Sequence, residues 1–279
     1  MRVNTNMNAL LAHNSATKNT ALAGNSMEKI SSGLRITKAG DDAAGLAISE
    51  KMRSQIRGLD QANRNVQDGI SLIQTAEGGM EEVGNILQRM RELTVQVSNE
   101  TNQPEEREKI TEELSQLQAE ITRISEATEF NGKKLLNGDN ATIAIQAGAN
   151  TGADQSITID IEDISAIDLQ GDIDAISGAA DIAAGTTAAS TLLDNIDAAI
   201  ETVNAGRATL GAQQNRLEYT QNNLTTSSEN LTAAESRIRD VDVAKEMVTL
   251  SKLNILSQAS QAMISQANQQ PQGVLQLLR

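Results

Sequence analysis

Few side chains of this chain have the chemistry that catalysis requires. Its 279 residues include no cysteine and one histidine, His13, so disulfide bonds and thiolate chemistry are excluded. A catalytic triad built on histidine has only this residue to draw on, and a zinc site with two histidines cannot form. We interpret His13 as structural or solvated, and we predict no enzyme activity, no metal site and no cofactor.

Carboxylates are the other reactive groups, and in the middle of the chain no basic residue balances them. The net charge is -14, which argues against nucleic acid as a partner. Between Leu135 and Gly206 there is no lysine or arginine. The same segment holds twelve acids: Asp139, Asp154, Asp160, Glu162, Asp163, Asp168, Asp172, Asp174, Asp181, Asp194, Asp197 and Glu201. Their spacing lacks the order of a calcium loop, so we predict a solvated, mutually repelling surface in place of a calcium site.

Without a catalytic constellation, the spacing of apolar residues is the most informative feature. In residues 48–97, apolar residues recur at every third or fourth position. Within this series only Gln55, Gly69 and Thr94 are not apolar. This pattern predicts a helix of about 50 residues, roughly 75 Å long at ~1.5 Å per residue. Its apolar stripe is narrow, so the helix must lie against other long helices.

Two further seams match the first. One recurs every seven residues, at Val203, Leu210, Leu217, Leu224, Leu231 and Ile238. A shorter one comprises Ile110, Leu114, Leu117, Ile121 and Ile124. Helices with such seams can bury one another within one chain, and a sustained seven-residue repeat implies left-handed supercoiling. Only 1% of the residues are aromatic, which suits thin seams between helices better than a thick globular core.

Turn and cap residues divide the chain into elements. We expect a helix over residues 1–33 that Gly33 ends, and a second helix capped by Asp41 or Asp42. Gly78 and Gly79 should be the weakest point of that second helix.

The middle of the chain should be more varied. Pro104 suits the first position of a helix that runs to about residue 128. Turns at 131–132 and 137–138 precede two alternating isoleucine runs that predict a β-hairpin. We expect a loop or short irregular helix in residues 165–190, and a long helix from about Ser190.

The two ends of the chain are almost free of charge. Residues 253–278 contain no charged side chain, and up to Met27 only Arg2 and Lys18 are charged. Such helices suit a packed, partly wet protein–protein interface. We predict assembly contacts at Val3, Met7, Leu10, Leu11, Val248, Ile255, Leu256, Ala259 and Met263. The chain shows no apolar run of the kind found in a signal peptide or a membrane span, so we expect neither.

Ordered motifs at both ends resemble those of bacterial flagellins. Near the N-terminus they are SSGLRI at 31–36, DDAAGLAI at 41–48, DGIS at 68–71 and QTAE at 74–77. Near the C-terminus they are ENLTAAESRIRD at 229–240 and NILSQA at 254–259. The resemblance covers about residues 1–150 and 195–279. It implies a mainly α fold: a long antiparallel coiled-coil rod with a small β-hairpin region and paired terminal helices.

The resemblance also implies a division into domains. Residues 1–40 and 240–279 would form the filament core, or inner tube. Residues 41–239 would form a rod domain, with the hairpin at about 130–163 and a short acidic variable segment at about 164–190. Large outer domains would be absent.

The implied function is that of a structural subunit that polymerises into the extracellular flagellar filament for motility. The subunit would be exported unfolded and assembled at the filament tip. Its partners would be other copies of itself, a flagellar export chaperone, the type III export apparatus, and the hook-associated and cap proteins. No nucleic acid and no membrane insertion are expected.

The segment around Arg89 resembles the flagellin segment that Toll-like receptor 5 recognises. The resemblance implies receptor contacts at Gln88, Arg89, Leu93 and Glu113. The helical spacing leaves Arg89 and Leu93 one turn apart on a face off the seam, where they could form a hot spot. Alternatively, these residues serve only packing between neighbouring protofilaments.

Two other classes of protein remain as alternatives. A chemoreceptor signalling hairpin shares long heptads rich in alanine, serine and glutamine, but the isoleucine and glycine pattern between the two arms argues against it. A flagellin-like hook–filament junction protein would use the same end helices, and it would join structures instead of polymerising.

Overall fold

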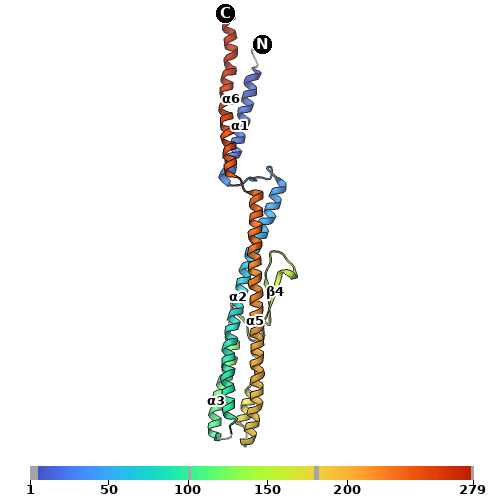
Figure 1. Ribbon diagram of the computed structural model, residues 1–279, viewed down its shortest axis with the longest axis vertical. Helices are drawn as coiled ribbons and strands as arrows, with labels where there is room; N and C mark the ends of the chain where they lie inside the picture. Colours follow the sequence, from blue (N-terminus) through green and yellow to red (C-terminus); the bar gives the residue numbers. More distant parts are fainter. Residues whose placement is uncertain (1–5, 100–101, 179–181, 278–279) are drawn as a thin grey trace. The chain divides into compact units, whose positions relative to one another are not determined.

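The computed structural model describes residues 6–99, 102–178 and 182–277, and helices dominate them (Figure 1). The α-helices are α1 (Met7–Ser32), α2 (Ala43–Val97), α3 (Pro104–Ala127), α4 (Gln170–Ser177), α5 (Ile182–Arg239) and α6 (Val243–Leu277). The predicted fold class, long helices with a small β region, is therefore confirmed. The described residues fall into two compact units: unit 1, within Met1–Ile56 and Glu229–Arg279, and unit 2, Arg57–Ser228.

Two small antiparallel hairpins interrupt the helices of unit 2. The first pairs β1 (Glu129–Phe130) with β2 (Lys133–Lys134) around Asn131 and Gly132, which have φ of 50° and 76°. This Asn-Gly turn has the positive φ values that favour a tight hairpin. The second pairs β3 (Thr142–Gln146) with β4 (Ser156–Asp160), and a short 3-10 helix (Ala153–Gln155) precedes β4. The alternating isoleucines thus predicted this second hairpin correctly.

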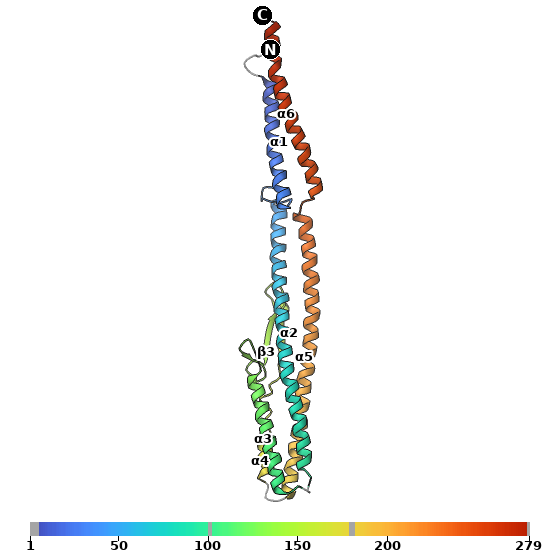
Figure 2. The same cartoon turned by 90° about the vertical axis from the view of Figure 1, so that its left-hand side faces the viewer.

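The core of unit 2 lies along the predicted seams of α2 and α5, which run side by side (Figure 2). From α2, Val66, Ile73, Met80 and Leu87 are fully buried. They share one hydrophobic cluster with a buried row from α5: Val203, Leu210, Leu217 and Leu224. Burial of such a continuous apolar stripe, at roughly 25 cal/mol per Å², supplies the main stabilisation of long paired helices.

The hairpins and the turn after α3 approach α2 closely at its glycines. At Gly69 an added Cβ would lie 3.2 Å from Ile145 of the second hairpin, and at Gly79 it would lie 2.8 Å from Leu136. Gly69 interrupts the apolar series because Ile145 of the hairpin fills the space that a side chain at residue 69 would need. Gly79, expected to be a weak point, is a packing position. Its neighbour Gly78 has nothing within 4 Å of an added Cβ.

The most buried stripe of α3 differs from the predicted one. Leu114 and Ile121 are buried as expected, but Ile110, Leu117 and Ile124 are only partly buried. The stripe is completed by polar residues: Arg107, Thr111, Gln118 and Ser125. Gln118 explains part of the difference, because its amide donates a hydrogen bond of 2.8 Å to the backbone carbonyl of Ile167. The segment that covers α3 here presents backbone, and backbone carbonyls require donors.

The prediction that the last long helix begins near Ser190 was wrong, because α5 begins at Ile182. The alanine and threonine residues of 183–190 looked like a simple, irregular stretch, yet alanine has the highest helix propensity. The short helix expected earlier in this segment is α4. Ile164, Leu169, Ile173 and Ile176 anchor it in the core.

Unit 1 holds α1 and α6, which lie side by side (Figures 1 and 2). Gly33, with φ of 71°, ends α1 as predicted. Within the described part of unit 1, only Ile36, Leu253 and Ala267 are buried apolar residues. The hydrophobic cluster of the subunit lies entirely in unit 2, so unit 1 has little core of its own.

Candidate assembly interface

Large apolar side chains gather on the surface of unit 1. Among the described residues, twelve of the fourteen exposed large hydrophobic side chains belong to unit 1; the two others are Val95 and Tyr219. The twelve are Met7, Leu10, Leu11, Leu22, Met27, Ile48, Val243, Met247, Val248, Ile255, Leu256 and Met263. Single exposed apolar residues are normal, whereas a concentration of them marks an interaction surface.

Most of the predicted assembly residues belong to this surface. Met7, Leu10, Leu11, Val248, Ile255, Leu256, Ala259 and Met263 are all exposed. Among the large side chains of this set, Val248 at 70% and Ile255 at 66% are the most exposed. Val3 lies outside the described residues. The structure therefore places eight of the nine predicted residues on one helix pair, and their role in assembly stays a prediction.

A groove of about 460 Å³ runs between α1 and α6. Its apolar lining includes Leu11, Leu256 and Met263, and its polar lining includes Asn8, Ser15 and Gln266. The helices are joined across their contact by few hydrogen bonds. Asn6 donates to the carbonyl of Ala267 at 2.7 Å, and the hydroxyls of Thr20 and Ser257 lie 3.4 Å apart. Neither helix contributes a charged group to the groove. A partner surface with apolar or amide side chains can therefore bind there without the free-energy cost of desolvating an ion.

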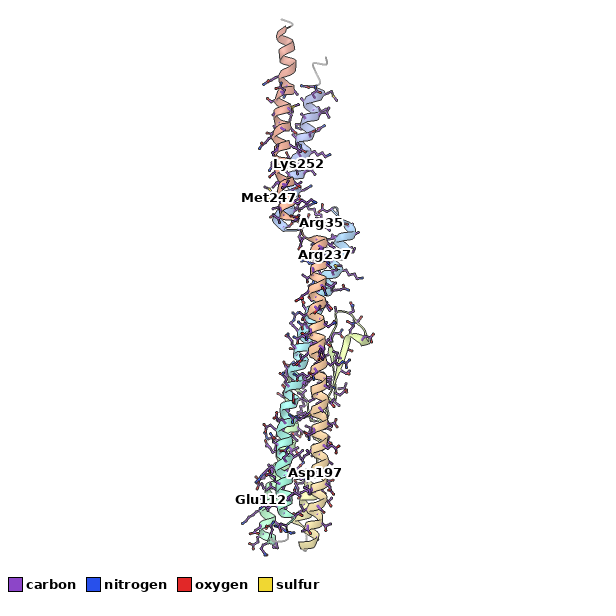
Figure 3. All side chains as sticks on the ribbon, viewed as in Figure 1. Arg35, Glu112, Asp197, Arg237, Met247 and Lys252 are labelled. Carbon is purple, nitrogen blue, oxygen red and sulfur yellow. The ribbon has the colours of Figure 1, made fainter. Side chains whose placement is uncertain are left out.

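The connectors between the helices of unit 1 pair with each other. The backbone N–H of Arg35 donates to the carbonyl of Arg239 at 2.6 Å, and that of Val241 donates to the carbonyl of Gly33 at 3.0 Å. Arg35 lies beside the end of α5, where Arg237 is also found (Figure 3), and its guanidinium donates to the carbonyl of Ile238. A cation at a helix C-terminus satisfies free carbonyls and suits the helix dipole. We call this pairing of residues 33–35 with 238–241 the connector clasp.

Ion pairs flank the connector clasp. Arg239 is bound to Glu50 at 2.5 Å, and Arg53 approaches Glu235 at 3.7 Å. The remainder of the first connector is ordered by Asp41, whose carboxylate accepts from the backbone N–H groups of Thr37 and Lys38. These backbone hydrogen bonds, with one from the Thr37 hydroxyl, lower the pKa of Asp41 below its usual range.

Asp42 caps the N-terminus of α2, and it is one of the two residues predicted for this role. Its carboxylate accepts from the N–H of Gly45 at 2.9 Å. Sequence reasoning recognised the capping acids but not the connector clasp. The sequence signal for the clasp was a set of arginines at positions 35, 237 and 239. They lie next to the two connectors between helices, which contain glycine or aspartate.

A separate polar cluster on unit 2 contains the residues predicted to contact the receptor. Arg89 of α2 binds Glu113 of α3 at 3.0 Å and Glu92 at 3.2 Å. The hydrogen bonds that Arg89 donates to Glu113, and then to Glu92, raise the pKa of Arg89 above its already high ordinary value. Gln88, Arg89 and Glu113 are exposed, so three of the four predicted receptor residues are available on the surface of the free subunit.

The expectation that Leu93 lies off the buried seam was wrong. Its side chain is 3% exposed and belongs to the hydrophobic cluster of unit 2. Helical spacing defined the seam toward one partner helix, but α2 is covered by both α5 and α3 at this point (Figure 2). The exposed apolar residue of this region is Val95, which sequence reasoning did not single out.

The described acidic side chains of residues 135–206 face solvent. Of the twelve acids predicted to do so, eleven lie in the described residues and none of these is buried; Asp181 lies outside them. No group of three or more acids or histidines is close enough to hold a metal ion within the described part of the chain. None of the helices in the same residues is long and apolar enough to cross a membrane.

Comparison with known proteins accounts for both ends of the chain. Residues 3–141 match the bacterial flagellin N-terminal helical region, and residues 193–278 match the bacterial flagellin C-terminal helical region. A flagellin of Halalkalibacterium halodurans is 56% identical over 279 residues, and the match covers 100% of each chain. The chain belongs to the bacterial flagellin family. A flagellin of Bacillus subtilis is 54% identical over 307 residues, again with 100% of each chain covered.

Membership of the flagellin family establishes the class of function. The chain is a structural protein of the extracellular flagellar filament and not an enzyme. A solved structure assigned as a flagellar hook-associated protein from Vibrio parahaemolyticus has a TM-score of 0.63. It is 13% identical, and the match covers 72% of this chain and 100% of that one. At that identity the likeness shows a shared fold alone.

Proposed function

We propose that this flagellin polymerises by burying the exposed apolar surface of α1 and α6 between neighbouring copies. The observation that carries the proposal is the concentration of twelve exposed large apolar side chains on unit 1. Two helices that bury so little within one chain gain most of their stabilisation from contacts made in the polymer. Residues 1–40 and 240–279 then form the inner tube of the filament, and residues 41–239 form the rod domain outside it.

Such assembly couples the ordering of the ends to binding. The ends lose conformational entropy only when a neighbour covers them, and the burial of apolar area offsets that cost. A subunit with weakly folded ends suits export in an unfolded state and folding at the filament tip. This route requires an export chaperone, the type III export apparatus, and cap and hook-associated proteins as partners.

The proposal predicts unequal effects of removing two exposed apolar side chains. Ile255→Ser on α6 should raise the concentration of subunit that remains soluble in seeded polymerisation by about tenfold, the equivalent of ~1.4 kcal/mol. Val95→Ser on α2 is the matched control and should change it by less than about threefold. Far-UV circular dichroism should be unchanged for both, because both side chains are exposed in the free subunit. Equal polymerisation of the Ile255→Ser variant and the unaltered chain would contradict the proposal.

Filament growth also separates the subunit from a hook–filament junction protein. Electron microscopy of seeded reactions should show long tubes whose length grows with the amount of added subunit. Short rings or caps under all seeded conditions would favour the junction protein. The sequence identity of 56% to a flagellin over the full chain supports the filament subunit.

We propose a second role, recognition of the free subunit by Toll-like receptor 5. It is supported by the resemblance at Gln88, Arg89, Leu93 and Glu113 and by the exposed pair of Arg89 with Glu113. Because Leu93 is buried in the hydrophobic cluster of unit 2, it supports this part of α2 and does not itself contact the receptor.

Receptor reporter cells test this second role. Arg89→Ala should reduce signalling by at least about tenfold if the arginine is a hot spot, because such residues are typically worth more than ~1–2 kcal/mol. Arg123→Ala is the matched control, since Arg123 pairs with Glu120 on an exposed part of α3. An equal response to both variants and to the unaltered subunit would contradict receptor recognition at this site.

A further inference from the structure

Six of the eight methionines of this chain fall into two groups with different environments. Those of unit 2, Met80 and Met90, are fully buried. Four on α1 and α6 are exposed: Met7 by 55%, Met27 by 62%, Met247 by 48% and Met263 by 61%. Met52 of α2 is partly buried, and Met1 lies outside the described residues.

The four exposed methionines lie on the helices that the proposed assembly buries. Met263 lines the groove between α1 and α6 together with Leu11 and Leu256. Met247 is on α6 near Lys252 (Figure 3). Methionine suits such a surface, because its unbranched side chain and polarizable sulfur adapt to irregular contacts.

The same exposure makes these thioethers accessible to oxidants. A peroxide transfers one oxygen atom to the sulfur, which is oxidised to a sulfoxide by two electrons, while hydrogen peroxide is reduced to water. The chain contains no cysteine, so no thiol competes for the oxidant. Exposed thioethers are therefore its main sites of reaction with peroxide.

We infer that Met7, Met27, Met247 and Met263 are oxidation sites that control whether a free subunit can join the filament. The inference rests on the proposed polymerisation through α1 and α6. A sulfoxide oxygen is strongly hydrated, and burying it in a mainly apolar contact costs the free energy of removing that water. Subunits within a filament are protected, because the same contacts cover their sulfur atoms.

Peroxide treatment followed by seeded polymerisation tests the inference. Free subunit is treated with hydrogen peroxide, the peroxide is removed with catalase, and sulfoxides are located by peptide mass spectrometry. The treated subunit should leave about tenfold or more soluble protein than the untreated one. Reduction by methionine sulfoxide reductases should restore polymerisation, because it converts the sulfoxide back to the thioether.

Two variants locate the effect. The Met7→Leu, Met27→Leu, Met247→Leu and Met263→Leu quadruple variant should polymerise to within about twofold of its untreated level after peroxide, because leucine keeps the apolar volume. The Met80→Leu and Met90→Leu double variant should stay as sensitive as the unaltered chain. Normal polymerisation by subunits that carry sulfoxide at the four positions would overturn the inference, as would equal sensitivity of the quadruple variant. If untreated subunit fails to polymerise on seeds, the proposed function itself fails.

Discussion

At the scale of single residues, two arginines of α2 join this helix to both of its neighbours. Arg89 binds Glu113 of α3, and Arg91 binds Asp197 of α5 at 2.6 Å. Figure 3 places Asp197 on α5 in the same part of unit 2 as Glu112 of α3. Exposed pairs of this kind contribute little energy each, but they favour one register of the three helices.

The pair of Arg91 with Asp197 predicts a pH dependence of stability. The hydrogen bond from Arg91 holds the pKa of Asp197 below its usual range. Its contribution is therefore complete above the ordinary aspartate pKa of about 4 and is lost as the pH falls through the lower value of the folded state. In thermal unfolding between about pH 5 and pH 2, the melting temperature of Asp197→Asn should fall less steeply with decreasing pH than that of the unaltered chain.

A second acid of α5 serves as the control for this prediction. Asp194→Asn removes an exposed carboxylate from the same helix and should leave the slope of melting temperature against pH nearer to that of the unaltered chain. Identical slopes for Asp197→Asn and the unaltered chain would show that the pair does not form in solution.

At the scale of elements, adjacent glycines of α2 should respond oppositely to alanine. An alanine Cβ at residue 78 meets nothing within 4 Å, so Gly78→Ala should stabilise the subunit by about 0.5–1 kcal/mol through helix propensity. At residue 79 the Cβ would lie 2.8 Å from Leu136 and 2.9 Å from Thr128. Gly79→Ala should therefore destabilise by about 1–3 kcal/mol through overpacking, despite the same gain in propensity.

Urea unfolding of the two variants tests whether alanine at residues 78 and 79 has opposite effects on stability. The midpoint should rise for Gly78→Ala and fall for Gly79→Ala, with similar slopes against denaturant. Stabilisation by both substitutions would mean that the turn containing Leu136 does not pack on α2 in solution.

The same pair of glycines shows how far the sequence predicts the elements. Periodicity predicted the long helices, and cap residues such as Asp42 and Gly33 predicted their ends, because both depend on local geometry. Sequence spacing cannot tell which glycine is a packing position, since that depends on a turn nearly sixty residues further on. The burial of Leu93 failed as a prediction for the same reason: periodicity shows one seam, and α2 has two covered faces.

The exposed apolar surface of α1 and α6 was easier to predict from the sequence than the details of unit 2. Assembly contacts were inferred from the absence of charged residues at both ends. Charge depletion can be seen from composition alone, without knowing which residues contact each other. The connector clasp was missed because backbone pairing between residues 33–35 and 238–241 leaves no side-chain pattern. Arginines at helix ends were its only trace in the sequence.

At the scale of the whole molecule, the hydrophobic cluster and the exposed apolar surface belong to different units. The cluster lies in unit 2, whereas unit 1 carries most of the exposed apolar side chains. Under the proposed assembly, folding of the free subunit and growth of the filament depend on different residues. This separation predicts that the ends can be removed without unfolding the remainder.

Deletion of residues 1–33 and 246–279 tests that separation. The truncated chain keeps every residue of the hydrophobic cluster, so it should retain most of the far-UV helical signal of the remaining residues and a cooperative thermal transition. It should not add to filament seeds, because the exposed apolar residues of α1 and most of those of α6 are gone. A truncated chain that still forms filaments of the full-length geometry would show that assembly depends on unit 2. Loss of the cooperative transition would show that unit 1 stabilises unit 2, although it supplies none of the residues of the cluster.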